Sequence, residues 1–418
     1  MCGPVPGFPR IEGALTCDGV ALGDIAALAG TPVHVYSAAL IAERYRALEA
    51  PFEAYPHRLH YAIKANATLA VVRLLRGLGA RADANSGGEI DVALRAGFKP
   101  EDIVFTGVGK SRDEIGRAVS LGVAAINAES PGEVDRIAAT AAAAGVRARV
   151  AVRINPDVDA GSHPHISTGH QATKFGMSID DARAMILDIA RRPGLDIVGL
   201  HVHVGSQVTR PGPIARAVGA IAALAAELAG RGIHLSHLDV GGGLGVAYEP
   251  GQSVMSPEEY AGAILPAVAP TGLTLVLEPG RWIVAPAGVL LARVVDLKRR
   301  PGGGWFVIVD AGMTDLIRPA LYGAWHTIEA VSPRSGPPIP CDIVGPVCET
   351  SDTLGAGREL PPVDVDDLVV VRDTGAYGAV MASNYNRRPM AAEVMVEDGR
   401  ARVVRRRQTV DDLFLWDE

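Results

Sequence analysis

Short apolar and β-branched runs recur along the first two thirds of the chain, each followed by a segment whose Ala and Leu residues have helical spacing. Strands are expected at Leu59–Ile63, Arg81–Ala84, Ile103–Phe105, Ala124–Ile126, Arg149–Ile154, Val198–Val204, Ser236–Val240 and Thr274–Leu277. Eight strands alternating with helices is the count of a (β/α)8 barrel, in which all strands run parallel. The pattern therefore predicts an α/β barrel over residues 40–283.

The pattern changes after Trp282, where strand-like runs are separated by turns rather than by helices. These runs are Val289–Leu297, Trp305–Asp310, Asp367–Arg372, Ala392–Glu397 and Ala401–Arg405. Such spacing is typical of an all-β domain, so we expect a C-terminal antiparallel β-sandwich or barrel over residues 284–418. Residues 1–39 contain the strand-like run Val33–Tyr36, and we expect this segment to add to the β domain.

The segment from Asn155 to Met177 has no clear period and is rich in Pro, Gly, His and Ser. A long loop that follows a barrel strand lies on the C-terminal face, where barrel active sites are built. It is a candidate active-site loop, and an ordinary surface insertion is the alternative.

Charge and composition exclude several classes of partner. Lys plus Arg number 40 against 47 Asp plus Glu, a net charge of −7, and there is no basic block of the kind that nucleic acid requires. The most apolar stretch, Val218–Gly230, contains Glu227 and is too short to span a membrane. The four cysteines lack metal-ligand spacing, and no basic segment precedes an apolar one at the N-terminus, so a reduced, cytoplasmic setting is expected.

Polar residues stand where barrel strands should end. Lys64 closes the first strand, as either a surface residue or a partly desolvated amine able to form a Schiff base. The Gly-rich segment Asp239–Gly245 closes the seventh strand, and Glu278–Arg281 closes the eighth. Phosphate sites of barrels often form from the loops after these two strands, so with Lys64 the pattern favours pyridoxal phosphate over a dinucleotide.

His201 and His203 lie two residues apart at the end of the sixth strand, and would face the same side of it. They could share a metal, with Asp239 or His163 as the third ligand. The competing interpretation is that one imidazole stacks on a planar cofactor while Ser206 binds its phosphate. Lys64 and the glycines favour the cofactor, and no metal is expected.

Together these segments resemble the fold-type III pyridoxal-phosphate decarboxylases over nearly the whole chain. The matching motifs are Tyr61–Asn66, Ser86–Glu89, His165–Gly169, Lys174–Gly176, His201–Gln207, Asp239–Gly245, Glu278–Arg281, Asp310–Met313, Ile317–Tyr322, Gly345–Glu349 and Gly375–Gly378. The resemblance implies an alanine racemase-like barrel with a β domain, and pyridoxal 5'-phosphate as the cofactor.

By this resemblance Lys64 holds the cofactor as a Schiff base, His203 stacks on its ring and Glu278 lies beside the pyridine nitrogen. Asp83 and Glu89 would position the ring and its lysine, although both could be ordinary helix-start carboxylates. The residues expected around the phosphate are Ser206, Gly242, Gly243, Gly280, Arg281 and Tyr377. The similar alanine racemases place an arginine beside the pyridine nitrogen. A carboxylate there favours a pyridinium, which is the stronger electron sink, so Glu278 favours decarboxylation over racemisation.

The resemblance further implies decarboxylation of meso-2,6-diaminopimelate at its D-configured carbon to L-lysine and CO2, the last step of lysine biosynthesis. Cys348 matches the family's proposed acid and would reach the site from a second subunit, making a homodimer with shared active sites. The residues expected to bind substrate are Arg281, Arg318, Tyr322, Glu349 and Tyr377. Two arginines suit a distal carboxylate and would repel the distal ammonium of ornithine or lysine.

Two alternatives stay open. One is decarboxylation of another basic amino acid, because Asn85 and Thr350 depart from common family residues and leave fine specificity undecided. The other is a catalytically silent homologue that binds the cofactor. Retention of Lys64, Glu278 and Cys348 together argues against a silent protein.

Overall fold

The computed structural model describes residues 7–158 and 174–417, which form two compact units. The barrel unit comprises Tyr45–Val246 and Ser253–Gly280. The β unit comprises Met1–Arg44, Ala247–Gln252 and Arg281–Glu418. Units defined by internal contacts need not be folding domains, so the expected domain limits at residues 40 and 284 stay a prediction. The motif His165–Gly169, His163 and most of the candidate loop lie outside the described residues.

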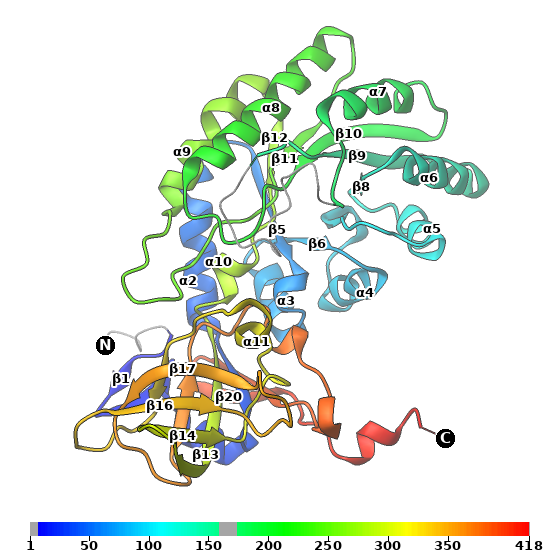
Figure 1. Cartoon of the computed structure of the whole chain (residues 1–418). Helices are drawn as coiled ribbons and strands as arrows, with labels where there is room; N and C mark the ends of the chain where they lie inside the picture. Colours follow the sequence, from blue (N-terminus) through cyan, green and yellow to red (C-terminus); the bar gives the residue numbers. More distant parts are fainter. Residues whose placement is uncertain (1–6, 159–173, 418) are drawn as a thin grey trace. The chain divides into compact units, whose positions relative to one another are not determined.

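Eight parallel strands close the barrel unit in chain order, with the last pairing with the first (Figure 1). The strands are β5 (His57–Ala62), β6 (Arg81–Ala84), β7 (Ile103–Phe105), β8 (Ala125–Ala128), β9 (Ala148–Ile154), β10 (Leu195–Val202), β11 (His237–Asp239) and β12 (Thr274–Leu277). The predicted barrel is confirmed, with strand ends shifted by up to three residues. One such shift places Lys64 just beyond its strand, in a short 3-10 turn at Ile63–Ala65.

Helices follow the barrel strands and lie outside them (Figure 1). They are α3 (Leu69–Gly77), α4 (Gly87–Ala96), α5 (Arg112–Leu121), α6 (Pro131–Ala144), α7 (Ile179–Ile189), α8 (Pro211–Gly230) and α9 (Pro257–Val268). Five of them begin at a serine whose hydroxyl accepts a backbone N–H of the first turn: α4, α5, α6, α7 and α9. A serine cap satisfies one of the donors that a helix start leaves unpaired, so local sequence fixes these boundaries.

Barrel strands are apolar on both faces because side chains fill the interior and helices cover the exterior. Val150, Ala151 and Val152 on β9 are consecutive and all fully buried. Helix α8 is long and apolar enough to cross a membrane, but half of its most apolar window is buried and it packs on α9 and β10. It is therefore a helix of the barrel's outer layer.

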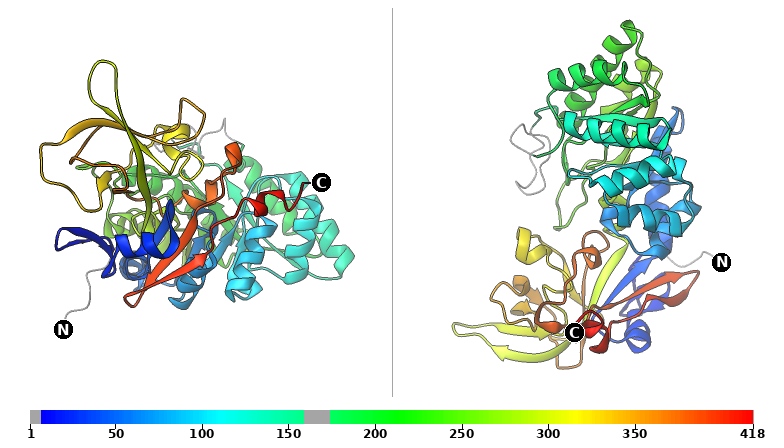
Figure 2. Two further views of the ribbon diagram at one scale, coloured as in Figure 1. Left: turned by 90° about the horizontal axis from the view of Figure 1, so that it is seen from below. Right: turned by 90° about the vertical axis from the view of Figure 1, so that its right-hand side faces the viewer.

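A nine-stranded sheet dominates the β unit, and Figure 2 shows β13 and β14 extending as a long hairpin, in yellow-green. Its strands are β4 (Val33–Ser37), β13 (Gly288–Arg299), β14 (Trp305–Val309), β15 (Ile328–Ala330), β16 (Ile339–Val344), β17 (Thr353–Leu360), β18 (Leu368–Val371), β19 (Ala392–Glu397) and β20 (Arg400–Arg405). A small sheet precedes it: β1 (Arg10–Ile11), β2 (Ala14–Cys17) and β3 (Val20–Ala21). The remaining helices are α1 (Leu22–Ala29), α2 (Ala38–Glu49), α10 (Arg281–Val284) and α11 (Arg318–Tyr322).

Alternation along β13 shows how this sheet is buried. Leu290 and Val294 pack into one apolar cluster, while Val289 and Leu291 pack into a second. Successive side chains of a strand point to opposite faces, so this sheet carries a core on each side. The N-terminal strand β4 pairs with β13 and β19 in this sheet.

The sheet is mixed rather than wholly antiparallel. Pairs β14–β16 and β4–β19 are parallel, and the others are antiparallel. A parallel pair needs a long connection, and each of these pairs is separated by a long stretch of chain. Hydrophobic alternation identifies a strand but carries no information about the direction of its partner, which explains why sequence missed this feature.

Candidate active site

Lys64 lies at the C-terminal end of the barrel strands, among polar residues of the next strand. Its Nζ donates to Asp83 Oδ2 at 3.0 Å and lies 3.4 Å from Asn85 Oδ1. Asp83 is fully buried, and burial together with the charge of Glu278 raises its pKa, while Lys64 opposes that shift. The amine is thereby directed and held by a buried carboxyl group.

A cavity of about 220 Å³ adjoins this lysine. Its lining consists of residues at or just after the ends of barrel strands, with Phe175 from the candidate loop: Lys64, Asn85, Thr106, Gly107, Arg153, Phe175, His201, His203 and Glu278. We call this the barrel cavity. Its place at the C-terminal face is where barrel enzymes build their active sites.

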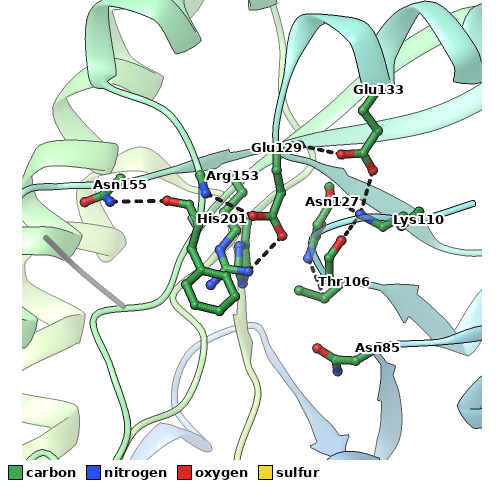
Figure 3. Close-up of polar contacts among 12 residues, drawn as sticks. Asn85, Thr106, Lys110, Asn127, Glu129, Glu133, Arg153, Asn155 and His201 are labelled. Carbon is green, nitrogen blue, oxygen red and sulfur yellow. Dashed lines mark hydrogen bonds and ion pairs between the residues drawn. The ribbon is translucent and has the colours of Figure 1, made fainter. Parts of the chain in front are cut away.

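Glu278 follows β12 and is held by two donors. His201 Nε2 and Thr106 Oγ1 each lie 3.3 Å from a different oxygen of this carboxylate. Thr106 in turn accepts from Asn127 Nδ2 at 3.0 Å (Figure 3). Burial by itself would raise the pKa of Glu278, but His201 and Lys64 outweigh it and hold that pKa well below its usual range. Glu278 is therefore an anion in a buried site.

His203 and the glycine segment pack against each other. The Gly242 N–H donates to His203 Nδ1 at 3.2 Å, so a neutral ring carries its proton on Nε2. Burial, aided by Lys64, lowers the pKa of His203 to about 3. A Cβ on Gly242 would lie 2.1 Å from the Glu278 carbonyl oxygen, and one on Gly243 would lie 2.4 Å from Gly205 O. Glycine is required at both positions because a neighbouring backbone oxygen lies too close to leave room for a side chain.

The other residues expected around the cofactor have less specific surroundings. Ser206 is half-buried beyond β10. A Cβ on Gly280 would lie 2.9 Å from Ala65 Cβ, so a glycine permits close packing there. Glu89 lies in the first turn of α4 and accepts the Asn85 N–H at 2.7 Å, while burial raises its pKa to about 6. Its contact is that of a helix-start carboxylate, the alternative that the sequence left open.

Sequence reasoning missed Arg153, which lines the barrel cavity. Its guanidinium donates to Glu129 at 2.9 Å and lies 4.8 Å from the ring centre of Phe175. Glu129 also accepts the Gly176 N–H at 2.9 Å, so it joins strand β9 to the end of the candidate loop (Figure 3). An arginine inside an apolar strand was the available signal, because an unpaired buried charge is costly. Asn85 and Thr106, each just after a strand, carried the same kind of signal.

The two histidines of the pair have different neighbours. His203 is engaged by Gly242, whereas His201 lies with Asp239 and Glu278, one ligand atom of each within 4.8 Å of the others. Among the described residues this is the one such trio. His163, the other suggested ligand, lies outside the described part of the chain.

A second polar group, the arginine cluster, lies within the β unit and consists of Arg281, Arg318, Tyr248, Tyr377 and His326. Arg281 donates to the Tyr248 hydroxyl at 2.7 Å and its guanidinium lies 4.8 Å from the centre of the Tyr377 ring. The guanidinium of Arg318 lies 4.5 Å from the centre of the Tyr248 ring. Both arginines are buried. Tyr248 and His326 were not anticipated.

His326 provides a neutral acceptor for Arg318. Its Nδ1 lies 2.7 Å from the Arg372 carbonyl and donates to it, so Nε2 accepts from Arg318 at 2.8 Å. Burial, reinforced by the charge of Arg318, lowers the pKa of His326 to about 3. No carboxylate of residues 7–158 or 174–417 forms an ion pair with Arg318, and its hydrogen-bond acceptor among them is the neutral His326 ring. Burial raises the pKa of Asp373 to about 6, and the charge of Arg318 is among those that oppose this shift.

Cys348 and Glu349 lie on an exposed loop of the β unit. The Cys348 N–H donates to Asn386 Oδ1 at 2.9 Å, and the Asp352 carboxylate accepts the Val347 N–H at 2.7 Å. Among the described cysteines Cys17 and Cys341 are buried, so Cys348 is the exposed one. Tyr322 is half-buried at the end of α11.

Comparison with known proteins identifies the family of the barrel. Residues 38–285 match the family described as "Pyridoxal-dependent decarboxylase, pyridoxal binding domain". The barrel, its strand-end lysine and this match define a class, the pyridoxal-phosphate-dependent decarboxylases of fold type III.

Full-length relatives narrow the class. The diaminopimelate decarboxylase of Pseudomonas aeruginosa is 47% identical over 97% of this chain and 97% of its own length. The crystal structure of the Helicobacter pylori diaminopimelate decarboxylase complexed with L-lysine has a TM-score of 0.91 at 41% identity, covering 94% of this chain and 98% of that one. The corresponding lysine complex from M. jannaschii has a TM-score of 0.94 at 34% identity, covering 99% and 98%. The chain belongs to the diaminopimelate decarboxylase family.

Proposed function

We propose that this protein decarboxylates meso-2,6-diaminopimelate at its D-configured carbon, giving L-lysine and CO2. The observation that carries the proposal is Glu278, a buried anion that lines the same cavity as Lys64. The full-length similarity to diaminopimelate decarboxylases supports the choice of substrate.

The described residues fit pyridoxal phosphate. The barrel cavity offers an amine, a neutral imidazole and a carboxylate, and the glycine segment brings backbone closer than any side chain would allow. When bound, the cofactor supplies an electron sink for the carbanion left by loss of CO2. Lys64 would hold it covalently, His203 would pack on its ring, and the Glu278 anion would favour a protonated pyridine nitrogen. Asp83 and Glu89 would position the lysine end of the site.

The phosphate and the substrate need cationic and hydrogen-bonding partners. Those proposed for the phosphate are Ser206, Gly242, Gly243, Gly280, Arg281 and Tyr377, and those for the substrate are Arg281, Arg318, Tyr322, Glu349 and Tyr377. Arg318 suits the distal carboxylate because its hydrogen-bond acceptor among the described residues is neutral, and a guanidinium binds a carboxylate through two parallel hydrogen bonds. Glu349 would attract the distal ammonium.

Cys348 would donate the proton that replaces the lost carboxylate. A protonated thiol can act as a general acid. Cys348 is exposed, which suits a residue that completes the active site of a second copy, so we propose a homodimer with shared active sites. We further propose that the enzyme acts in the cytoplasm.

The decisive experiment measures CO2 release by purified, cofactor-loaded protein supplied separately with meso-diaminopimelate, lysine, ornithine and arginine. We expect release from meso-diaminopimelate alone. Release only from another basic amino acid would replace the substrate and keep the reaction type. Absence of release from all four would overturn the proposed activity in favour of the silent homologue.

A further inference from the structure

Asp239, the last residue of β11, is buried beside the cavity but has no role in the proposed function. Its Oδ1 accepts the Gly241 N–H at 2.9 Å. Its Oδ2 is buried and has no hydrogen-bond partner among the described residues. An oxygen of this carboxyl group lies within 4.8 Å of Glu278 and of His201. A buried polar atom without a partner is costly, so its protonation state requires an explanation.

Counting charges identifies the group that can be neutral. The carboxyl groups of Asp83, Asp239 and Glu278 are among those buried at this end of the barrel. Asp83 has Lys64, and Glu278 has His201 and Thr106. Asp239 forms no ion pair with any described cation, and as an anion it would lie next to the Glu278 anion. Two buried carboxylates at such a distance do not both ionise.

We propose that Asp239 is a neutral carboxylic acid that donates a hydrogen bond from Oδ2 to Glu278, and that it thereby acts as a positioning residue for this carboxylate. The proton belongs on Oδ2 because Oδ1 is occupied by the Gly241 N–H. Burial and the charge of Glu278 both raise the pKa of Asp239 well above its usual range, in agreement with this assignment.

The hydrogen bond has two consequences for the site. Glu278 gains a third donor besides His201 and Thr106, which fixes its orientation and favours its anionic form. Asp239 also connects Glu278 to the backbone of the glycine segment, because its other oxygen accepts the Gly241 N–H. This inference rests on the proposed function in one respect, since Glu278 matters for catalysis only as the partner of the cofactor's ring nitrogen.

Replacing the acid by its amide separates this inference from its alternative. Asp239→Asn keeps the acceptor for Gly241 and offers an N–H in place of the O–H, so we expect kcat/KM within about threefold of wild type, since one neutral donor replaces another. The 15N signal of the pyridine nitrogen in labelled holoenzyme should be unchanged. Asp83→Asn is the matched control. Because Asp83 accepts from Lys64, the amide there should lower kcat/KM by about 10- to 100-fold.

The proton can also be observed directly. The difference infrared spectrum between wild-type and Asp239→Asn holoenzymes should contain the C=O stretch of a protonated carboxyl group at neutral pH. Absence of this band would overturn the inference, as would an Asp239→Asn variant that is as impaired as Asp83→Asn and has a shifted 15N signal. The infrared band does not depend on the substrate, so failure of the proposed function and failure of this inference are distinguishable.

Discussion

The barrel cavity and the arginine cluster bury charge in opposite ways. In and around the cavity, each charged side chain has a polar partner: Lys64 contacts Asp83, Arg153 contacts Glu129, and Glu278 contacts His201. In the arginine cluster, two guanidiniums are buried against tyrosine rings, and the acceptor of Arg318 is a neutral imidazole. The cavity balances its own charges, whereas the cluster keeps an excess of positive charge.

This difference indicates that the two regions have different functions. A site that is already balanced can hold the ring of a cofactor without a further counter-charge, and its anion can tune that ring. A cluster with excess positive charge is stabilised by an incoming anion, such as a carboxylate or phosphate of a ligand. Substitutions in the cavity should therefore change cofactor binding and chemistry, and those at Arg318 should change substrate binding.

The largest effect is expected for Lys64→Ala. Loss of the amine removes the covalent attachment of the cofactor, so turnover should fall by about 10⁴-fold, the upper range for a positioned acid–base group. The visible absorbance of the bound cofactor should change at the same time. An unchanged spectrum would show that another residue holds the cofactor. It would then contradict the assignment of cofactor binding to the barrel cavity.

Cys348→Ala should lower kcat by about 10²- to 10³-fold, as expected for loss of a general acid, with little change in cofactor content. Equal losses of turnover and cofactor affinity would contradict the acid role.

Mixing inactive Lys64→Ala and Cys348→Ala proteins should restore partial activity if subunits share sites. Lack of rescue despite demonstrated subunit exchange would count against sharing.

Arg318→Gln tests the other side of the comparison. Removing one charge-assisted carboxylate contact should raise KM for meso-diaminopimelate by about 10- to 100-fold and leave the cofactor spectrum unchanged. Arg358→Gln is the control, because that arginine also stacks on an aromatic ring of the β unit, 3.0 Å from the centre of Trp325. A similar KM change in both variants would mean that stacking, rather than substrate charge, explains the effect.

The smallest expected effect is on the pH dependence of stability and involves His34, which lies outside both regions. This histidine has no assigned function, so it isolates the effect of burial on the pKa. Both ring nitrogens lack a hydrogen-bond partner among the described residues, and burial lowers its pKa from 6.5 to about 4. Between these values the unfolded chain binds a proton that the native state does not, so the free energy of unfolding falls as pH falls below about 6.5.

His34→Leu should remove this loss, making the variant less sensitive to acid by about 1–2 kcal/mol near pH 5 in urea unfolding. His234→Leu is the control, because that histidine is exposed. Equal acid sensitivity of the wild type and His34→Leu would show that His34 titrates normally in the native state.

The barrel was predictable because its signals are local. Short apolar runs mark the strands, serines such as Ser111 and Ser256 cap the helices, and both kinds of signal lie within a few residues of what they specify. Lys64, His203 and Glu278 were predictable as neighbours because strands of a parallel barrel end on one face. Their proximity therefore followed from position within each strand.

The sequence by itself determined the barrel, the strands β4, β13, β14, β18, β19 and β20 of the β unit, and the type of chemistry that Lys64 and Glu278 can perform. Strands β15, β16 and β17 were not predicted. Tertiary structure decided the parallel pairing of β4 with β19, the neutral imidazole that accepts from Arg318, and the carboxyl pair of Asp239 and Glu278. The strand pair and the carboxyl pair join residues distant in the chain, and the ring of His326, close to Arg318 in sequence, is oriented by the more distant Arg372 carbonyl. The protonation of a buried group depends on which charges surround it in space, and that arrangement exists only once the chain has folded.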